Sequence, residues 1–283
     1  KWDGSSWTEV NDLNTARSTS GSAGVTNTAA LFFGPPARAE SWDGSSWTEI
    51  AELNTERQYP GGAGAYTAAL AIGGDTDPGI VAITESWDGT SWTEIADLST
   101  ARRQNFGSGV NTSALASGGY TSTQVANVEE FSTAGATDTL VNNGQVFYRS
   151  DTGDFKISLT QFGTGAWASG GNTNTQDTER GGSAGTQTAG LIFGGGVSGA
   201  DYAATNEGYN GTAWTELADL TTGRRSIKGS VNSPQTAVIA FCGEVSGGAV
   251  SGLVELWNGT GWTETTEVNT AVNTQGGCGI STA

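Results

Sequence analysis

Histidine is absent from the 283-residue sequence, and so is methionine. Without histidine, Ser-His-Asp and Cys-His catalysis lose their general base, and the usual zinc and copper sites lose their commonest ligand. Enzymes and metal oxidases that depend on histidine are therefore excluded. Carboxylate chemistry is the main route left by which this chain could catalyse a reaction.

Basic residues are scarce as well: 12 Lys and Arg stand against 29 Asp and Glu, which gives a net charge of −17. An acidic chain is a poor partner for the phosphate backbone of nucleic acids, and its charge favours solubility in salt-rich surroundings. No apolar run approaches the roughly 20 residues of a membrane span. We expect no nucleic-acid partner, no membrane insertion and no cofactor.

Cysteine occurs only twice, at Cys242 and Cys278. The two residues could form one disulfide, but a sequence does not supply the Cα separation that a disulfide requires. Both the bonded and the free state stay open.

One pattern recurs through the chain: an aromatic residue is followed five positions later by Trp, as in SWDGSSWTEIAELNT over 41–55. Its occurrences begin 31 to 48 residues apart if a degenerate one is counted at Phe131, with Ala136 in place of the Trp. This period is typical of a four-stranded β-propeller blade. The pairs are Trp2/Trp7, Trp42/Trp47, Trp87/Trp92, Phe162/Trp167, Tyr209/Trp214 and Trp257/Trp262.

Local signals within each unit indicate β-strands. Asp-Gly or Asn-Gly, as at Asp43-Gly44, lies between the two aromatic residues and favours a tight hairpin. Upstream, a strand of Gly and Ala precedes an apolar strand that ends in Gly-Gly, as over 62–74. Such small residues suit the crowded axis of a propeller. We expect the second Trp of each pair to form the core between blades: Trp7, Trp47, Trp92, Trp167, Trp214 and Trp262.

The order of Arg, small-residue strand, Gly-Gly strand, Glu-containing strand and Trp, as over 57–92, resembles the kelch repeat. The resemblance covers nearly the whole chain. It implies an all-β propeller of four-stranded kelch-like blades whose ring is closed by N- and C-terminal strands. Kelch-type copper oxidases need ligand histidines, so their activity does not carry over. The expected blades are 17–55, 56–100, 101–140, 141–175, 176–222, 223–270, and 271–283 together with 1–16.

The number of blades stays open between seven and six. Residues 141–175 are the irregular unit: as a short separate blade they give seven, and as an insertion in the preceding blade they give six. Since the unit shared by the two chain ends lacks its apolar strand and no Met begins the sequence, we expect a single propeller domain excised from a longer polypeptide.

Most charged residues obey the repeat, which favours structural roles. Glutamates two positions after the Trp, such as Glu49 and Glu94, recur in register. A catalytic acid should break the repeat, so we expect no enzyme; a carboxylate-dependent glycosidase or sialidase-like enzyme is the alternative. The arginines at one repeat position also look structural: Arg17, Arg57, Arg102 and Arg224.

Residues that depart from the repeat are the candidates for binding, because loops on one propeller face usually carry it. Asp75 and Asp77 could hold calcium through oxygen ligands, but two carboxylates alone make a poor site and a polar turn is the alternative. The binding candidates are Tyr59, Tyr66, Tyr120, Phe147, Tyr148, Arg149 and Tyr202.

The segments FYRSDTGDFKISL and GAWASGGNTNT also resemble kelch-like repeats in predicted structural proteins of marine bacteriophages. This resemblance implies a virion or another extracellular protein. We predict a non-enzymatic, rigid platform for adhesion or assembly, such as part of a tail or fibre. Its partners would be other subunits of a larger assembly, or a glycan or protein receptor on a surface.

Overall fold

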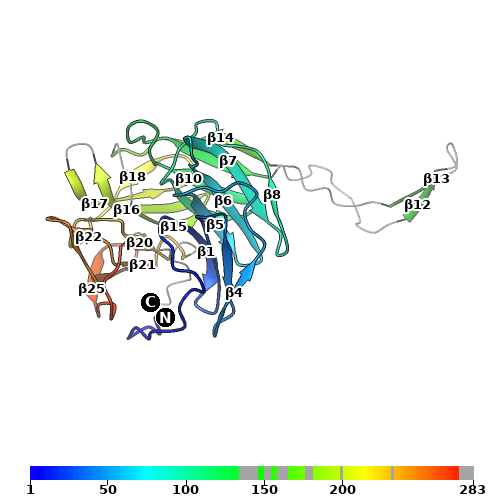
Figure 1. The fold of residues 1–283 in the computed structure, drawn as a ribbon. Helices are drawn as coiled ribbons and strands as arrows, with labels where there is room; N and C mark the ends of the chain where they lie inside the picture. Colours follow the sequence, from blue (N-terminus) through cyan, green and yellow to red (C-terminus); the bar gives the residue numbers. More distant parts are fainter. Residues whose placement is uncertain are drawn as a thin grey trace.

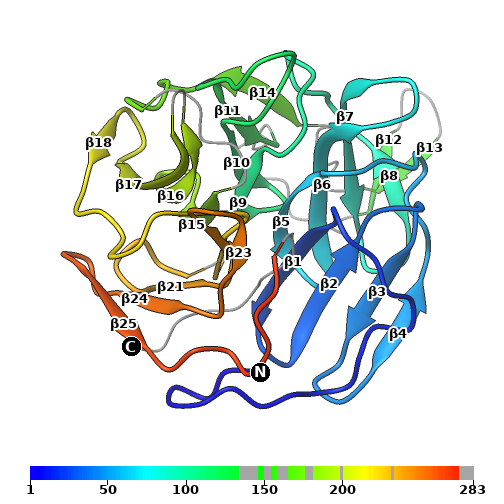
Figure 2. The same cartoon turned by 60° about the vertical axis from the view of Figure 1, so that its left-hand side comes forward.

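A computed structural model describes residues 1–133, 146–149, 154–157, 165–175, 181–197, 200–230 and 233–273. All regular elements in these residues are β-strands, most of them in antiparallel sheets (Figure 1). Viewed from a second direction, the sheets lie around a common centre with β1, β5, β9 and β15 innermost (Figure 2). Nothing in the described part of the chain forms a helix able to cross a membrane.

Five sheets have four strands each, and in every one the innermost strand comes first in sequence. The first is β1 (Gly21–Thr26), β2 (Ala29–Phe33), β3 (Ala39–Trp42) and β4 (Trp47–Ile50). The second is β5 (Gly61–Ala65), β6 (Ala68–Asp75), β7 (Ile80–Trp87) and β8 (Trp92–Glu94). The third is β9 (Phe106–Val110), β10 (Ser113–Ser117), β11 (Val128–Ser132) and β14 (Ala166–Ser169). The fourth is β15 (Gly182–Thr186), β16 (Ala189–Val197), β17 (Ala200–Tyr209) and β18 (Trp214–Glu216). The fifth is β20 (Lys228–Gly229), β21 (Val238–Phe241), β24 (Val254–Trp257) and β25 (Trp262–Thr265).

Two smaller sheets accompany these five. One is formed by the short strands β19 (Arg224–Arg225), β22 (Glu244–Val245) and β23 (Ala249–Val250). The other is a hairpin of β12 (Val146–Arg149) and β13 (Asp154–Ile157), drawn apart from the other sheets in Figure 1.

Strand β14 pairs with β11, so Trp167 lies opposite Phe131 with their ring centroids 5.1 Å apart. The separate blade expected over 141–175 is therefore wrong, because its outer strand completes the sheet of the preceding unit. Trp167, and not Ala136, takes the place of the second aromatic residue of that unit. The expected partner Phe162 lies outside the described residues. The hairpin β12–β13 is thus part of an insertion between the third and fourth strands.

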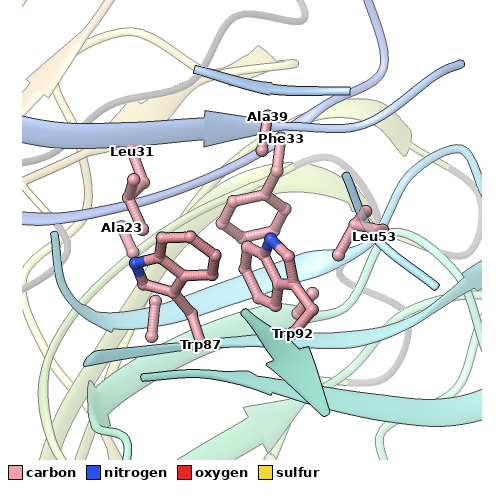
Figure 3. Packing of buried hydrophobic residues seen from close by; sticks show 9 residues of the cluster. Ala23, Leu31, Phe33, Ala39, Leu53, Trp87 and Trp92 are labelled. Carbon is pink, nitrogen blue, oxygen red and sulfur yellow. The ribbon is translucent and has the colours of Figure 1, made fainter. Parts of the chain in front are cut away.

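The hydrophobic core consists of four clusters, each between two consecutive sheets. In the first, Trp87 and Trp92 face Leu31 and Phe33 of the neighbouring sheet (Figure 3). The ring centroid of Trp92 is 5.2 Å from that of Phe33 and 5.4 Å from that of Trp87. Aromatic pairs at such distances stabilise packing beyond the area they bury. The core therefore joins neighbouring sheets face to face.

Burial of the second Trp of each pair differs along the chain. Trp92, Trp214 and Trp262 are buried, whereas Trp7, Trp47 and Trp167 are half-buried. The expected role between sheets is strongest for the buried three.

The innermost strands approach one another too closely for side chains. A Cβ atom on Gly62 of β5 would lie 2.2 Å from the carbonyl oxygen of Ser22 of β1. A Cβ atom on Gly107 of β9 would lie 2.3 Å from the carbonyl oxygen of Gly62. Since real Cβ contacts are not this short, these positions require glycine. Close packing at the axis explains the Gly-rich first strand of each unit.

The N-terminal segment contacts both the fifth and the first sheet, between which it lies in Figure 2. The ring of Trp7 lies 5.7 Å from that of Phe241, and Asn269 Nδ2 donates a hydrogen bond of 3.1 Å to the Trp7 carbonyl. On the other side, Asn14 Nδ2 donates to the Trp47 carbonyl at 2.9 Å. The same Asn-to-Trp bond joins Asn54 to Trp92, 2.8 Å apart, in consecutive sheets.

We predict that Trp92→Ala lowers the free energy of unfolding by about 3 to 5 kcal/mol, because it opens a cavity between the first two sheets. Urea unfolding of the purified domain measures this loss. Tyr66→Ala is the matched control, since the Tyr66 side chain is 43% exposed. Equal midpoints for the two variants would contradict the role of Trp92 in the core.

Candidate ligand-binding surface

The four arginines of the repeat are buried and paired with glutamates. Their guanidinium groups each donate to a carboxylate on the third strand of the four-stranded sheet that follows them in the sequence. The pairs are Arg17–Glu40, Arg57–Glu85, Arg102–Glu129 at 2.8 Å and Arg224–Glu255 at 2.7 Å. Three of these arginines are 0% exposed. The structural role expected for them is confirmed, so they are not free to bind a substrate carboxylate.

Each of these glutamates also holds the connection that arrives from the preceding sheet. The Glu85 carboxylate accepts a hydrogen bond of 2.7 Å from the backbone N–H of Asn54, and Glu129 accepts one of 2.7 Å from Ser99. Burial lowers the pKa of Arg102, and the charge of Glu129 opposes that change. A buried charge that is paired and hydrogen-bonded stabilises one geometry of the chain. These acids therefore belong to the scaffold.

The aspartates of the Asp-Gly turns are also engaged in structural hydrogen bonds. Asp43 Oδ1 accepts hydrogen bonds of 2.8 Å from the backbone N–H groups of Ser45 and Ser46. These bonds stabilise the carboxylate and lower the pKa of Asp43 to about 2. A carboxylate that stays ionised at neutral pH cannot serve as a general acid. The repeated acids therefore give no support to carboxylate catalysis.

Left-handed backbone recurs two residues after each paired arginine. Thr19, Tyr59, Gln104 and Ser226 have φ angles between 53° and 60°. Non-glycine residues adopt this conformation only where their surroundings impose it. The Tyr59 N–H donates to the Thr19 carbonyl at 2.6 Å, and the Gln104 N–H donates to the Tyr59 carbonyl at 2.9 Å. The same backbone hydrogen bond thus recurs between equivalent residues of consecutive units.

The same four residues line one opening at the axis, which we call the mouth. Their backbone conformation obeys the repeat, but their side chains differ: hydroxyl, phenol, amide and hydroxyl. Beneath the mouth, the innermost strands surround a small cavity lined by Gly, Ser and Asn. A repeated scaffold therefore presents a different side chain from each unit to a single opening.

An arginine flanked by tyrosines borders the mouth. The Arg103 guanidinium carbon lies 5.5 Å from the ring centroid of Tyr59 and 4.9 Å from that of Tyr120. Arg103 Nη1 also donates to Asp75 Oδ2 at 2.7 Å, with the two side chains 30% and 24% exposed. Contacts between a cation and aromatic rings order all three side chains. The group remains open to solvent on one side.

A second group of this kind occurs at the equivalent position of the fifth unit. The Arg225 guanidinium carbon lies 4.8 Å from the ring centroid of Tyr202, and Arg225 Nη2 donates to Glu244 Oε1 at 2.7 Å. The Tyr202 hydroxyl donates to the same oxygen at 3.2 Å. Because Arg225 precedes Ser226 as Arg103 precedes Gln104, both groups lie beside the mouth.

The structure brings some of the sequence candidates together and separates others. Tyr59, Tyr120 and Tyr202 lie at or beside the mouth, whereas Tyr66 lies at the opposite end of β5, in the turn to β6. Phe147, Tyr148 and Arg149 belong to β12, and their side chains are outside what the structure describes.

The structure does not support the calcium site considered at Asp75 and Asp77. The guanidinium of Arg103 occupies an oxygen of Asp75 and brings a positive charge there, which disfavours a cation. No group of three or more acidic, His or Cys side chains suited to a metal occurs among the described residues.

Cys242 is a buried thiol, and burial raises its pKa. Its proposed partner Cys278 lies outside the described residues, so the disulfide stays a prediction.

Sequence reasoning missed Arg103, Gln104, Arg225 and Lys228. Each follows a repeated arginine within a few positions: Arg103 and Arg225 stand where the first two units carry Ser18 and Gln58, and Gln104 and Lys228 differ from all their counterparts. That departure was a usable signal. What the sequence did not show is that these positions meet at one opening.

The sequence matches no model of a protein family, and no curated protein matches it either. Structural comparison does find a match. The solved structure of YjhT, a kelch-repeat protein, superposes with a TM-score of 0.67 over 94% of this chain and 89% of that one, at 10% sequence identity. At this identity the likeness shows the fold alone. The chain is all-β and has the β-propeller fold of kelch-repeat proteins, as the sequence predicted.

We predict that Arg57→Met lowers the free energy of unfolding by about 3 to 5 kcal/mol, because it leaves the Glu85 carboxylate buried without its partner. The matched control is Arg38→Met. Its pair with Glu49 is exposed by 38% and 51%, so its loss should cost at most about 1 kcal/mol. Urea unfolding compares the two variants. Similar losses of stability in the two variants would show that the buried ion pair contributes no more than the exposed one.

Proposed function

We propose that this protein is a non-enzymatic, rigid binding platform whose mouth and flanking residues contact a glycan or a protein surface. The observation that carries the proposal is the ring of left-handed residues, Thr19, Tyr59, Gln104 and Ser226, which offers varied side chains on an unvarying backbone. Exposed tyrosine and arginine are the residue types that most often anchor partners at interfaces. Their order at this face would lower the entropic cost of binding.

The setting we propose is a larger extracellular or virion assembly. The resemblance of two segments to predicted phage structural proteins supports the virion part. The strongly acidic composition suits a protein that faces a salt-rich exterior. Against a glycosidase or sialidase-like function, the repeated acids and arginines are engaged in turns and buried pairs.

For the architecture we propose a ring of six units in which the N-terminal hairpin supplies the outer part of the sixth. Trp7 contacts Phe241 as Trp92 contacts Phe33 and Trp262 contacts Phe193. Each of these contacts joins the second Trp of one unit to a Phe on the second strand of the unit before it. The hairpin around the Trp2 and Trp7 bridge would therefore follow the fifth sheet and precede the first, which closes the ring.

Closure predicts that Trp7 and Phe241 are energetically coupled although they lie at opposite ends of the chain. In a double-mutant cycle of Trp7→Ala and Phe241→Ala, we expect a coupling energy of about 0.5 to 1.5 kcal/mol from the aromatic contact. Urea unfolding of the four proteins measures it. Strictly additive losses would contradict closure by this contact.

The platform predicts that binding depends on the mouth face. On an array of surface glycans, Arg103→Ala and Tyr202→Ala should weaken any bound glycan by about tenfold or more, because each loses a side chain ordered by its neighbours. Tyr66→Ala, at the other end of β5, should bind as the wild type does. The opposite dependence would contradict the proposal, and hydrolysis of arrayed glycans would favour the enzyme alternative.

A further inference from the structure

The cavity beneath the mouth has a volume of about 50 Å³. Five residues line both the cavity and the mouth: Ser20, Pro60, Asn105, Phe106 and Lys228. A space of this size holds a few water-sized groups. It can therefore accept the polar end of a small molecule that enters through the mouth.

Lys228 departs from the repeat at this cavity. It pairs across its sheet with Phe241, in the register where Gly21 pairs with Phe33 and Gly182 pairs with Phe193. In those two units a Cβ atom would lie 2.6 Å and 2.3 Å from the phenylalanine ring. The fifth unit instead places a long cationic side chain where these two units have glycine and the third unit has Phe106.

The described residues provide no counter-charge for Lys228. Among the described residues that line the cavity and the mouth, it alone carries a charge. It forms no ion pair with the part of the chain that the structure describes. Lys228 is half-buried, and since it lines the cavity, some of its remaining surface faces that space. Burial lowers the pKa of Lys228 to about 8, so at neutral pH most of the molecules carry the charge.

Asn105 belongs to the wall of the cavity, where its Nδ2 atom donates a hydrogen bond of 3.0 Å to the Ile72 carbonyl. Its Oδ1 atom is buried against Gly61 and has almost no accessible surface. The cavity therefore offers a ligand one charged group, Lys228, in a wall of otherwise neutral residues.

We propose that the axial cavity binds a small carboxylate anion, whose carboxylate pairs with Lys228. A carboxylate supplies the anion that the ammonium group lacks, and a charge-assisted hydrogen bond is stronger than a neutral one. This proposal rests on the proposed function, because it assigns a ligand class to the same mouth.

The test uses three small probes that separate the effect of the carboxylate from that of the hydroxyl group. Glycolate carries a carboxylate and a hydroxyl, acetate carries the carboxylate alone, and ethylene glycol carries hydroxyls alone. Each is titrated at low ionic strength into the full 283-residue chain labelled with ¹⁵N, and the amide shifts of Gly107 and Gly229, which line the cavity, are followed by NMR. The variant Lys228→Met keeps the length of the side chain and removes its charge.

We expect saturable shifts with glycolate and with acetate at millimolar concentrations, and none with ethylene glycol. Lys228→Met should lose glycolate binding while its spectrum stays that of the folded protein. Its melting temperature should not fall, since an uncompensated charge has been removed from the cavity.

Three results would overturn the proposal. The first is the absence of saturable shifts with glycolate up to about 50 mM in the wild type. The second is equal binding of glycolate by the wild type and by Lys228→Met. The third is equal binding of glycolate and ethylene glycol by the wild type, which holds even if the variant does not fold.

Arg103→Ala separates this proposal from the platform, because Arg103 borders the mouth but does not line the cavity. We expect it to bind glycolate as the wild type does. If glycolate does not bind while glycan binding depends on Arg103, the platform proposal holds and the cavity-site proposal is wrong. If glycolate binds through Lys228 while mouth variants leave glycan binding unchanged, the cavity site stands and the platform falls.

Discussion

The glutamate that each described unit buries on its third strand is the group on which the rest of the structure depends. Its carboxylate accepts a hydrogen bond from a backbone N–H of the incoming connection. In the four units where the structure describes an arginine before the innermost strand, the carboxylate also pairs with that arginine. Because a buried carboxylate without partners is costly, these contacts stabilise one another. One side chain thereby fixes where the chain leaves one sheet and enters the next, and it sets the spacing of sheets around the axis.

The position of the mouth follows from this arrangement. Each paired arginine directly precedes an innermost strand, so the residue two positions later always arrives at the axis in the same left-handed conformation. Just beyond it, the close approach of β1, β5 and β9 leaves room only for small residues such as Gly62 and Gly107. Packing therefore constrains the glycines strictly and the mouth side chains very little. The side chains therefore vary most at the positions where packing restricts them least.

Much of the fold could be predicted from the sequence, because the aromatic-to-Trp spacing, the Asp-Gly turns and the Gly-rich strands are local signals. The pairing of Trp167 with Phe131 could not, since Phe162 imitates the expected partner and strand pairing across an insertion leaves no local trace. The candidate site was predicted in part: Tyr59, Tyr120 and Tyr202 were identified as departures from the repeat. Lys228 and Arg103 were missed, because a sequence does not show which departures converge on the axis.

The insertion between β11 and β14 shows how tolerant the outer edge of this fold is. The corresponding strands β3 and β4 are joined by a tight turn over 43–46, whereas 133–165 separate Ser132 from Ala166. The entropy of closing a loop grows only with the logarithm of its length, so the longer connection costs about 2 kcal/mol more. The fourth strand still finds its place opposite Phe131. The outer hairpin is therefore a natural point for grafting foreign sequences, such as an epitope or a second binding module, onto the ring.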